Sequence, residues 1–501
     1  MSTTALRERL AELDAEIVEK KTVLKDLERD RTAVHRQLHA TSTFPVLTLP
    51  VEITAEIFSL SLPSIEEIRE HLSTSAWLES QAPTVFLGVC RAWKDIALET
   101  SALWATLPLR FDFISDNVAS EPGAVEKIID MWFRRAVLRP LSIVFFASEI
   151  SPDSPFTPSR LRDVIHCYAH RLQHIELYIC QCDIPQLGLD SVAFPLLRRA
   201  VLDDPFDPEP DPSNPVVIYN NAPQLHDLIL RNGTEFSFYA PPLLQLTKFE
   251  GEIDNLNLFV LAPNLLEADC VLHLRDLPTS PIFHPRLQSL TLCTPHYSDD
   301  EPIDVFPHLK LPALQYLHIS DIGSSPESLF LFLDRSSPPL STLSATVTGS
   351  FSQWDTCFAR VAATLENLEV FSTNTTFQNQ VLNLGSPNSD YNPLPRLRTF
   401  HLVTSIGADY KILVDFLRIR STTPALAKIR SFRVTCRPGA YLRDSFSNEL
   451  GTVTEPVEAI GHLARLASEG IDIYIETTEK TFIKHVQYIP GDPAYEFASR
   501  A

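Results

Sequence analysis

Cysteine and histidine are the side chains of this chain that could ligate a metal or attack a substrate, and their spacing favours neither. Cys180 and Cys182 lie near His170 and His174, but a CxC pair without a second cysteine pair is a weak zinc signature. The eight cysteines contain no CxxC pair, so we expect reduced, mostly buried thiols. The sequence has no Walker loop, GxSxG elbow, HExxH pair or GxGxxG fingerprint. It therefore predicts a protein that is not an enzyme, with no catalytic residue, metal ligand or cofactor.

Composition and charge point away from phosphate and nucleic acid. Of 501 residues, 44% are hydrophobic and 21% charged, as in globular proteins. Only 14 are glycine against 39 proline, which leaves few loops able to cradle phosphate, and the net charge of −21 repels nucleic acid. The sequence contains no apolar run of ~18 residues and no signal-peptide pattern at its start. We expect a cytoplasmic or nuclear protein, or both, with no nucleic-acid or membrane partner.

The first forty residues carry a heptad pattern with equal numbers of acidic and basic side chains. Apolar positions alternate at spacings of four and three, and Lys20 and Arg31 interrupt them. Pro45 and Pro50 are expected to end the helix. The pattern favours self-association or pairing with another helix; the alternative is an amphipathic helix that packs on its own protein or stays solvated. The apolar seam consists of Leu6, Leu10, Leu13, Ile17, Leu24, Leu27, Val34 and Leu38.

Two further segments, LTLPVEITAEIF (47–58) and VFLGVCRAWKDIALETSALWATL (85–107), predict a small helical unit with large aromatic anchors. In the first, one helical face is expected to hold Leu49, Ile53, Ile57 and Phe58, and Pro50 lies in the first turn, where its missing N–H costs nothing. The second continues with an apolar stripe at Val85, Val89, Trp93, Ile96 and Ala97.

Together these segments resemble an F-box of the form common among basidiomycete fungal proteins. The resemblance covers residues 48–108 and is carried by LPxEIxxEIF followed by LxVCRxWKxIAxxTxxLWxxL. The intervening stretch 63–83 lengthens the connection beyond a compact F-box and predicts a helix near Ile65 to His71. F-boxes bind the Skp adaptor of a cullin–RING ubiquitin ligase. The resemblance therefore implies adaptor binding, or support of it, by Leu49, Pro50, Ile53, Ile57, Val89, Cys90 and Trp93.

The rest of the chain repeats an LxxLxL register, with first positions roughly 26 residues apart between Leu172 and Ile429. Proline often stands two residues before the first position, as Pro195 does before Leu197, because its fixed φ stops a helix and opens a strand. The first member is Leu138, Leu141 and Ile143, and the poorest is Leu246, Phe249 and Gly251.

This register predicts an α/β fold with short parallel strands stacked side by side. Helical stretches at 325–336, 351–365, 409–420 and 455–468 separate the later strands, and GIDIYIETT predicts a closing strand. The region resembles an irregular leucine-rich-repeat solenoid, but it lacks the Asn or Cys that such repeats carry three residues after the last leucine.

In such solenoids the residues between and beside the strand leucines face the concave side, where partners dock. The resemblance implies a target-binding face made of Glu176, Ile229, Thr291, Tyr316, His318, Glu369, Phe371, His401 and Arg433. The acidic balance favours a target with a basic surface. The acidic stretch 203–212 is either a stiff solvated insertion or a site for a cation or basic protein.

We therefore expect a heptad helix at 1–40, an F-box domain at 41–110, a repeat solenoid at 111–490 and a tail at 491–501. Joined, they predict a noncatalytic substrate-recognition subunit of a Skp–cullin–F-box ubiquitin ligase. The alternative is a protein-interaction scaffold that works without a ligase.

Overall fold

The computed structural model describes most of the chain as helices and strands joined by short turns. They form two compact units, Met1–Thr106 with Asp130–Arg139, and Leu107–Ile129 with Pro140–Ala501. Within the described ranges, no helix has both the length and the apolar character that crossing a membrane requires. These ranges are 3–41, 49–71, 83–110, 124–146, 158–204, 216–231, 239–240, 243–274, 277–294, 304–320, 325–347, 351–372, 375–382, 394–404, 410–436, 457–476 and 481–484.

The first unit is helical. The heptad segment forms α1 (Thr3–Thr41), and the predicted helix between the two F-box-like halves forms α3 (Ile65–His71). Pro50 comes directly before α2, where its missing N–H leaves no helical hydrogen bond unmade. The other helices are α2 (Val51–Leu60), α5 (Thr84–Val89), α6 (Arg91–Glu99), the short η2 (Ser101–Trp104) and the last turns of α8 (Ala124–Arg135).

Aromatic rings form the core of this unit, as the sequence predicts. Phe58 of α2 stacks on Phe86 of α5 with ring centroids 4.1 Å apart, and Trp93 of α6 meets Phe58 edge-on at 4.9 Å. A second edge-on pair joins Trp104 to Trp132 at 4.8 Å. Such pairs add to the burial of their apolar surface, so they hold α2, α5 and α6 in one arrangement.

The second unit is built on one sheet of 15 strands. The strands from β2 to β18 pair in parallel and in chain order, and β19 pairs antiparallel with β18. Two short ladders lie apart from this sheet, β5 (Val216–Val217) with β7 (Tyr239–Ala240) and β10 (Ile282–Phe283) with β12 (Leu309–Lys310). The large sheet contains β1 (Thr106–Arg110), β2 (Leu141–Phe146), β3 (Leu172–Tyr178), β4 (Arg199–Asp203), β6 (Asp227–Arg231), β8 (Lys248–Ile253), β9 (Glu267–Leu272), β11 (Ser289–Cys293), β13 (Tyr316–Ser320), β14 (Thr342–Val347), β15 (Asn367–Ser372), β16 (Thr399–Thr404), β17 (Ser431–Cys436), β18 (Asp472–Glu476) and β19 (Thr481–Lys484).

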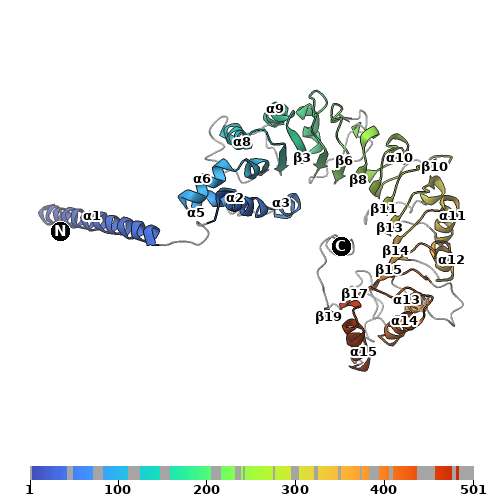
Figure 1. The fold of residues 1–501 in the computed structure, drawn as a ribbon. Coiled ribbons are helices and arrows are strands. Elements are labelled where there is room, and N and C mark those ends of the chain that lie inside the picture. Colours follow the sequence, from blue (N-terminus) through green and yellow to red (C-terminus); the bar gives the residue numbers. More distant parts are fainter. Residues whose placement is uncertain are drawn as a thin grey trace. The chain divides into compact units, whose positions relative to one another are not determined.

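Helices connect the strands along one face of the sheet, because each parallel connection must cross back over that face. In Figure 1 the strands line the inner side of this unit and the helices its outer side. The α/β fold is thus as predicted, with helices at all four expected places, whereas α9, α13 and β1 were not expected. The connecting helices are α9 (Pro158–Tyr168), α10 (Leu258–Leu261), α11 (Pro326–Ser336), α12 (Phe351–Val361), α13 (Thr375–Leu382), α14 (Tyr410–Thr422) and α15 (Val457–Ser468), with short turns η4 (Gln181–Leu187), η6 (Leu243–Gln245) and η7 (Phe306–His308).

The strand ladder gives the repeat register a physical meaning. We number ladder positions 1 to 5 along each strand, so that β4 runs from Arg199 (position 1) to Asp203 (position 5). Positions 2 and 4 hold the second and third apolar residues of each repeat and face the helices, where they are buried. Positions 1, 3 and 5 face the other way and form what we call the strand face. From β3 to β17 the ladder pairs the residues that the sequence register aligned.

The predicted register is wrong for the first repeat. The ladder pairs Ile143 with Ile175 and Phe145 with Leu177, so the apolar triplet lies two residues later than expected. Leu138, the expected first residue, is 89% exposed. Val137 beside it has a left-handed backbone (φ 53°), and this turn comes before the strand begins.

Side chains of the connecting helices and turns join one repeat to the preceding one. They donate hydrogen bonds to main-chain carbonyl oxygens about one repeat earlier, and the residue types vary from turn to turn. Arg335 donates to the carbonyls of Phe306 and Leu309, and Arg420 in the same way to Leu394 and Leu397. Other donors are Gln245 to Ala222, Asn264 to Leu244, His284 to Ala262 and Arg396 to Ala363. These bonds tie neighbouring repeats together through main-chain carbonyl groups.

Gly251 occupies position 4 of β8 because Phe249 takes the space. The Phe249 ring is fully buried and lies 3.2 Å from the point where a Cβ of residue 251 would be. The carbonyl oxygen of Leu230 lies 2.5 Å from the same point. The weakest member of the sequence register is therefore a compensated pair, with one large ring in place of two aliphatic side chains.

We expect Gly251→Ala to destabilise the second unit by about 1–3 kcal/mol, because the added methyl group overlaps a main-chain oxygen of the neighbouring strand. Gly88→Ala is the matched control: no atom lies within 4 Å of its Cβ position, and alanine favours helix α5 by up to ~1 kcal/mol. Thermal and urea unfolding of both variants measures the difference. A Gly251→Ala protein as stable as its parent would contradict this packing.

Candidate functional site

An apolar stripe on α2 remains uncovered. Ile53, Ile57 and Leu60 follow one another at i, i+4 and i+7 on one side of the helix, and they are 49%, 45% and 78% exposed. The other side holds Thr54 and Phe58, which are buried. The prediction that Phe58 shares the face of Ile53 and Ile57 is therefore wrong, because its ring packs into the core of the unit. Because α2 already buries one side in its own unit, the exposed stripe is free to bind a partner. Leu60 was missed at the sequence level, although its spacing from Ile57 gives the signal.

The residues matched to the adaptor-binding motif divide into two groups. Leu49, Pro50, Ile53, Ile57 and Val89 are exposed. Cys90 and Trp93 are partly buried and act within the unit. The Cys90 sulfur caps α6 by accepting a hydrogen bond from the Trp93 main-chain N–H at 3.5 Å. The Trp93 ring packs on Phe58.

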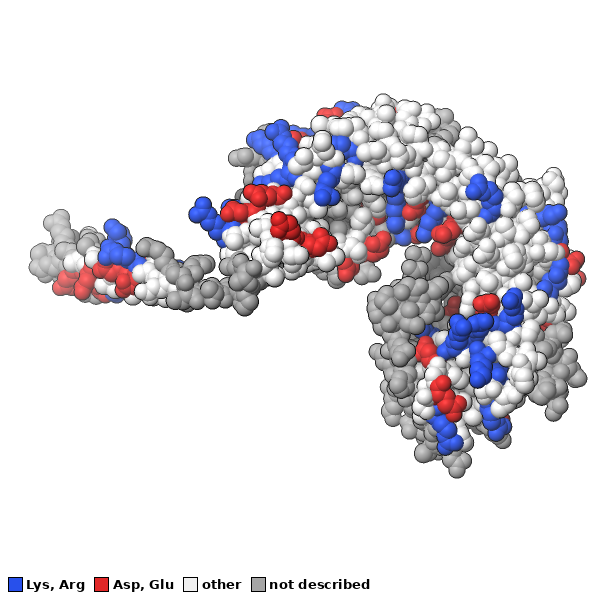
Figure 2. Space-filling model, in the orientation of Figure 1, with Lys and Arg blue, Asp and Glu red and all other residues white. Residues whose placement is uncertain are grey.

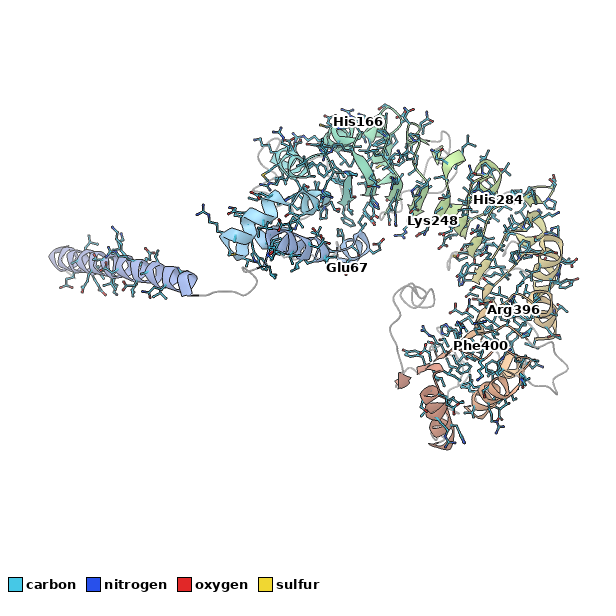
Figure 3. The ribbon with its side chains drawn as sticks, viewed as in Figure 1. Glu67, His166, Lys248, His284, Arg396 and Phe400 are labelled. Atoms are coloured by element: carbon cyan, nitrogen blue, oxygen red, sulfur yellow. The ribbon has the colours of Figure 1, made fainter. Side chains whose placement is uncertain are left out.

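The ladder brings every residue of the expected target-binding face to the strand face. Glu176, Ile229, Thr291, His318, Glu369, His401 and Arg433 are at position 3, Tyr316 is at position 1 and Phe371 at position 5. The residues from β11 onwards are partly exposed. Lys248 at position 1 of β8 lies on this inner side, whereas His166 and His284 lie on the helix side (Figure 3).

Two members of the expected face are not available to a partner. Glu176 is fully buried and Ile229 is 1% exposed. The cause is that β3, β4 and β6 are buried on both faces, whereas burial alternates along β8, β9, β11 and β13. Glu176 is instead held internally, by His174 Nε2 at 2.9 Å and by the Tyr178 hydroxyl, which donates to it at 3.0 Å.

Charged pairs cross the strands from β4 to β9. Acidic and basic side chains lie next to one another along this part of the unit (Figure 2). Burial raises the pKa of Asp227 despite the opposing charges of Arg199 and Lys248. Acidic residues outnumber basic ones on this part of the strand face, so its formal net charge is negative. The pairs are Arg199 with Asp227 at 3.4 Å, Arg231 with Glu250 at 2.8 Å, Lys248 with Glu267 at 3.5 Å and His273 with Glu252 at 3.4 Å.

A chain of hydrogen bonds crosses the five strands β13 to β17. His318 Nδ1 lies 2.8 Å from Ser344 Oγ, which donates to Glu369 Oε2 at 2.8 Å. His401 Nδ1 lies 2.8 Å from Glu369 Oε1, and its Nε2 lies 3.1 Å from Thr435 Oγ1. Four of these residues occupy ladder position 3, and Thr435 occupies position 5 of β17. We call these five residues the strand-face network.

The proton positions in the strand-face network follow from Glu369. Burial raises the pKa of its carboxyl group, but hydrogen bonds from His401 and Ser344 and the nearby imidazoles lower it by more, so the net shift is downward. An ionised Glu369 accepts the hydrogen bond from the Ser344 hydroxyl, whose proton is thereby occupied, so His318 donates its Nδ1–H to Ser344 Oγ. A histidine that donates to a hydroxyl oxygen cannot remove its proton. The arrangement therefore does not activate Ser344 as a nucleophile.

The cysteines are less buried than expected. Among those described, Cys270 and Cys357 are buried, Cys90, Cys180 and Cys293 are intermediate, and Cys167 and Cys182 are exposed. Burial raises the pKa of Cys357 to about 12, so that thiol stays protonated. The described residues contain no group of three or more His, Cys, Asp or Glu side chains placed to hold a metal ion.

We expect Glu369→Gln to lower the unfolding free energy of the second unit by about 1.5–3 kcal/mol at neutral pH, because it removes charge-assisted hydrogen bonds. A lowered carboxyl pKa stabilises the fold above the ordinary value of 4.5 and loses this effect as pH falls through the folded-state pKa. The gap between variant and parent should therefore close in acid.

Glu366→Gln is the control for this pH series. Its carboxylate lies 4.0 Å from Arg398 and both side chains are about 40% exposed, so the change should cost under ~1 kcal/mol. Urea unfolding of the three proteins between pH 3 and pH 7 provides the comparison. A Glu369→Gln deficit that stayed constant over this range would refute the ionised network.

No family model matches the chain, and no curated protein matches it. Its function is therefore argued from its own residues.

Proposed function

We propose that this chain is a noncatalytic substrate receptor of a Skp–cullin–F-box ubiquitin ligase, acting in the cytoplasm, the nucleus or both. The helical unit binds the Skp adaptor, and the strand face of the second unit holds a target protein. The ligase supplies the catalytic residues, and the receptor acts by holding the target close to them.

The α2 stripe carries this proposal. The residues that give the chain its likeness to an F-box are of two kinds, and the division fits adaptor binding. Leu49, Ile53 and Ile57 are apolar yet between 39% and 49% exposed, whereas Phe58 and Trp93 pack on each other and hold the unit together. Apolar side chains left in a row on a helix that already has a buried side mark an interaction surface.

The strand face supports the second half of the proposal. A parallel sheet with helices on one side leaves the other side open, and from β8 onwards most side chains on that side are polar and most are partly exposed. Such extended surfaces suit the binding of another protein. On β8 and β9, whose strand face is partly exposed, Glu250, Glu252, Glu267 and Asp269 outnumber Lys248. This acidic excess and the net charge of −21 favour a target with a basic surface. Classifying the unit as a leucine-rich-repeat solenoid belongs to the same proposal.

Adaptor binding is tested with two variants of α2. Ile53→Asp places a charge in the stripe and should weaken binding of purified Skp adaptor by about 30-fold or more, as for an interface hot spot. Val51→Asp is the matched control, because Val51 is 54% exposed but lies about 200° around the helix from Ile53. It should stay within about threefold of the parent.

Calorimetry or biolayer interferometry with the full-length chain gives both affinities. A parent protein that does not bind the adaptor, or an Ile53→Asp protein that binds as tightly as Val51→Asp, would refute the receptor function. Capture of a target by a chain that recruits no ligase activity would favour the scaffold alternative.

A further inference from the structure

The apolar seam of α1 is exposed along its described length. Leu10, Ile17, Leu24 and Leu27 are between 48% and 60% exposed, and Leu13 is 40% exposed. A 39-residue helix with half-exposed leucines in a heptad seam is incomplete alone, because isolated helices gain most of their stability from packing an apolar face. The question is which helix covers this seam.

Lys20 argues against a parallel pairing of two copies. In a parallel, in-register dimer, each seam residue faces its own counterpart, so Lys20 would face Lys20 and Arg31 would face Arg31. Two like charges would then meet twice within a short seam. Both side chains are exposed in the single chain.

The seam between residues 10 and 27 is complementary to itself when reversed. Leu10, Ile17 and Leu24 are a positions of the heptad, and Leu13, Lys20 and Leu27 are d positions. In an antiparallel pair, each a position faces a d position of the other helix, and residues face each other when their residue numbers add up to one constant sum. Leu10 then faces Leu27, Leu13 faces Leu24, and Ile17 faces Lys20. Each lysine stem lies on an isoleucine while its ammonium group reaches solvent.

An intrahelical salt bridge makes Lys20 compatible with this position in the antiparallel seam. Lys20 Nζ lies 2.6 Å from Glu16 Oε1 one turn earlier in the same helix. The Glu16 carboxylate thus compensates the charge of the Lys20 ammonium group at the edge of the seam. A second copy of the same chain can therefore cover this part of α1.

We infer that α1 binds a second copy of this chain as an antiparallel coiled coil, with Leu10 facing Leu27, Leu13 facing Leu24 and Ile17 facing Lys20. This inference does not depend on the ligase function. It makes the protein a dimer whose two helical partners point in opposite directions along the seam.

Acidic substitutions at two equivalent seam positions separate the orientations. Leu24→Glu puts a carboxylate against Leu13 and should raise the dimer dissociation constant by about 100-fold or more, since two buried leucines are lost per dimer. Ile17→Glu puts a carboxylate against Lys20 of the other copy and should keep the dissociation constant within about tenfold of the parent. In a parallel dimer both variants would bring glutamates face to face and both would dissociate.

A double variant provides the rescue. Leu13→Lys with Leu24→Glu creates two lysine–glutamate pairs in the antiparallel dimer and should restore dimerisation that either single change weakens. Sedimentation equilibrium of the full-length proteins measures each state. A parent that is monomeric at tens of micromolar, a loss of dimer with Ile17→Glu equal to that with Leu24→Glu, or a double variant that fails to recover would each overturn the inference.

Discussion

The second unit depends on one constraint, the in-register pairing of parallel strands. Each strand must place its second and fourth ladder residues against the helices, because a shift by one residue would turn them to the opposite face. This requirement is met by leucines in most repeats, and by alanine, cysteine or phenylalanine in others. The pair of Phe249 and Gly251 shows that volume is conserved across positions rather than at each one.

Pairing also decides what the open face can offer. Because positions 1, 3 and 5 follow automatically once positions 2 and 4 are buried, residues from distant repeats come into line. Ser344, Glu369 and His401 are each separated by a whole repeat in sequence, yet they form one hydrogen-bonded chain. These hydrogen bonds hold the polar side chains in place across neighbouring strands.

In the helical unit, a few aromatic rings form the core and leave one side of α2 outside it. Its rings at Phe58, Phe86 and Trp93 bury one side of each short helix, and this leaves the other side of α2 free to remain apolar and exposed. Trp93 and Ile53 belong to the same sequence pattern but have different surroundings, because Trp93 packs in the core and Ile53 lies on the exposed side of α2. A substitution of Trp93 would therefore test the core of the unit, whereas a substitution at Ile53 tests its surface.

The sequence alone determined the α/β class, the heptad helix, the helix at Ile65–His71 and the apolar register of most strands, because each follows from a local period or from proline. It did not determine which faces are covered. Glu176 and Ile229 have the same ladder position as Glu369, but they are buried because both faces of their strands are packed. The hydrogen bonds that Arg335, Arg420 and His284 donate to the preceding repeat could not be predicted from the sequence either. Different side chain types donate to the carbonyls of different repeats, and no common residue marks these positions. Burial and long-range hydrogen bonds depend on which segments meet in space, and only the tertiary structure fixes that.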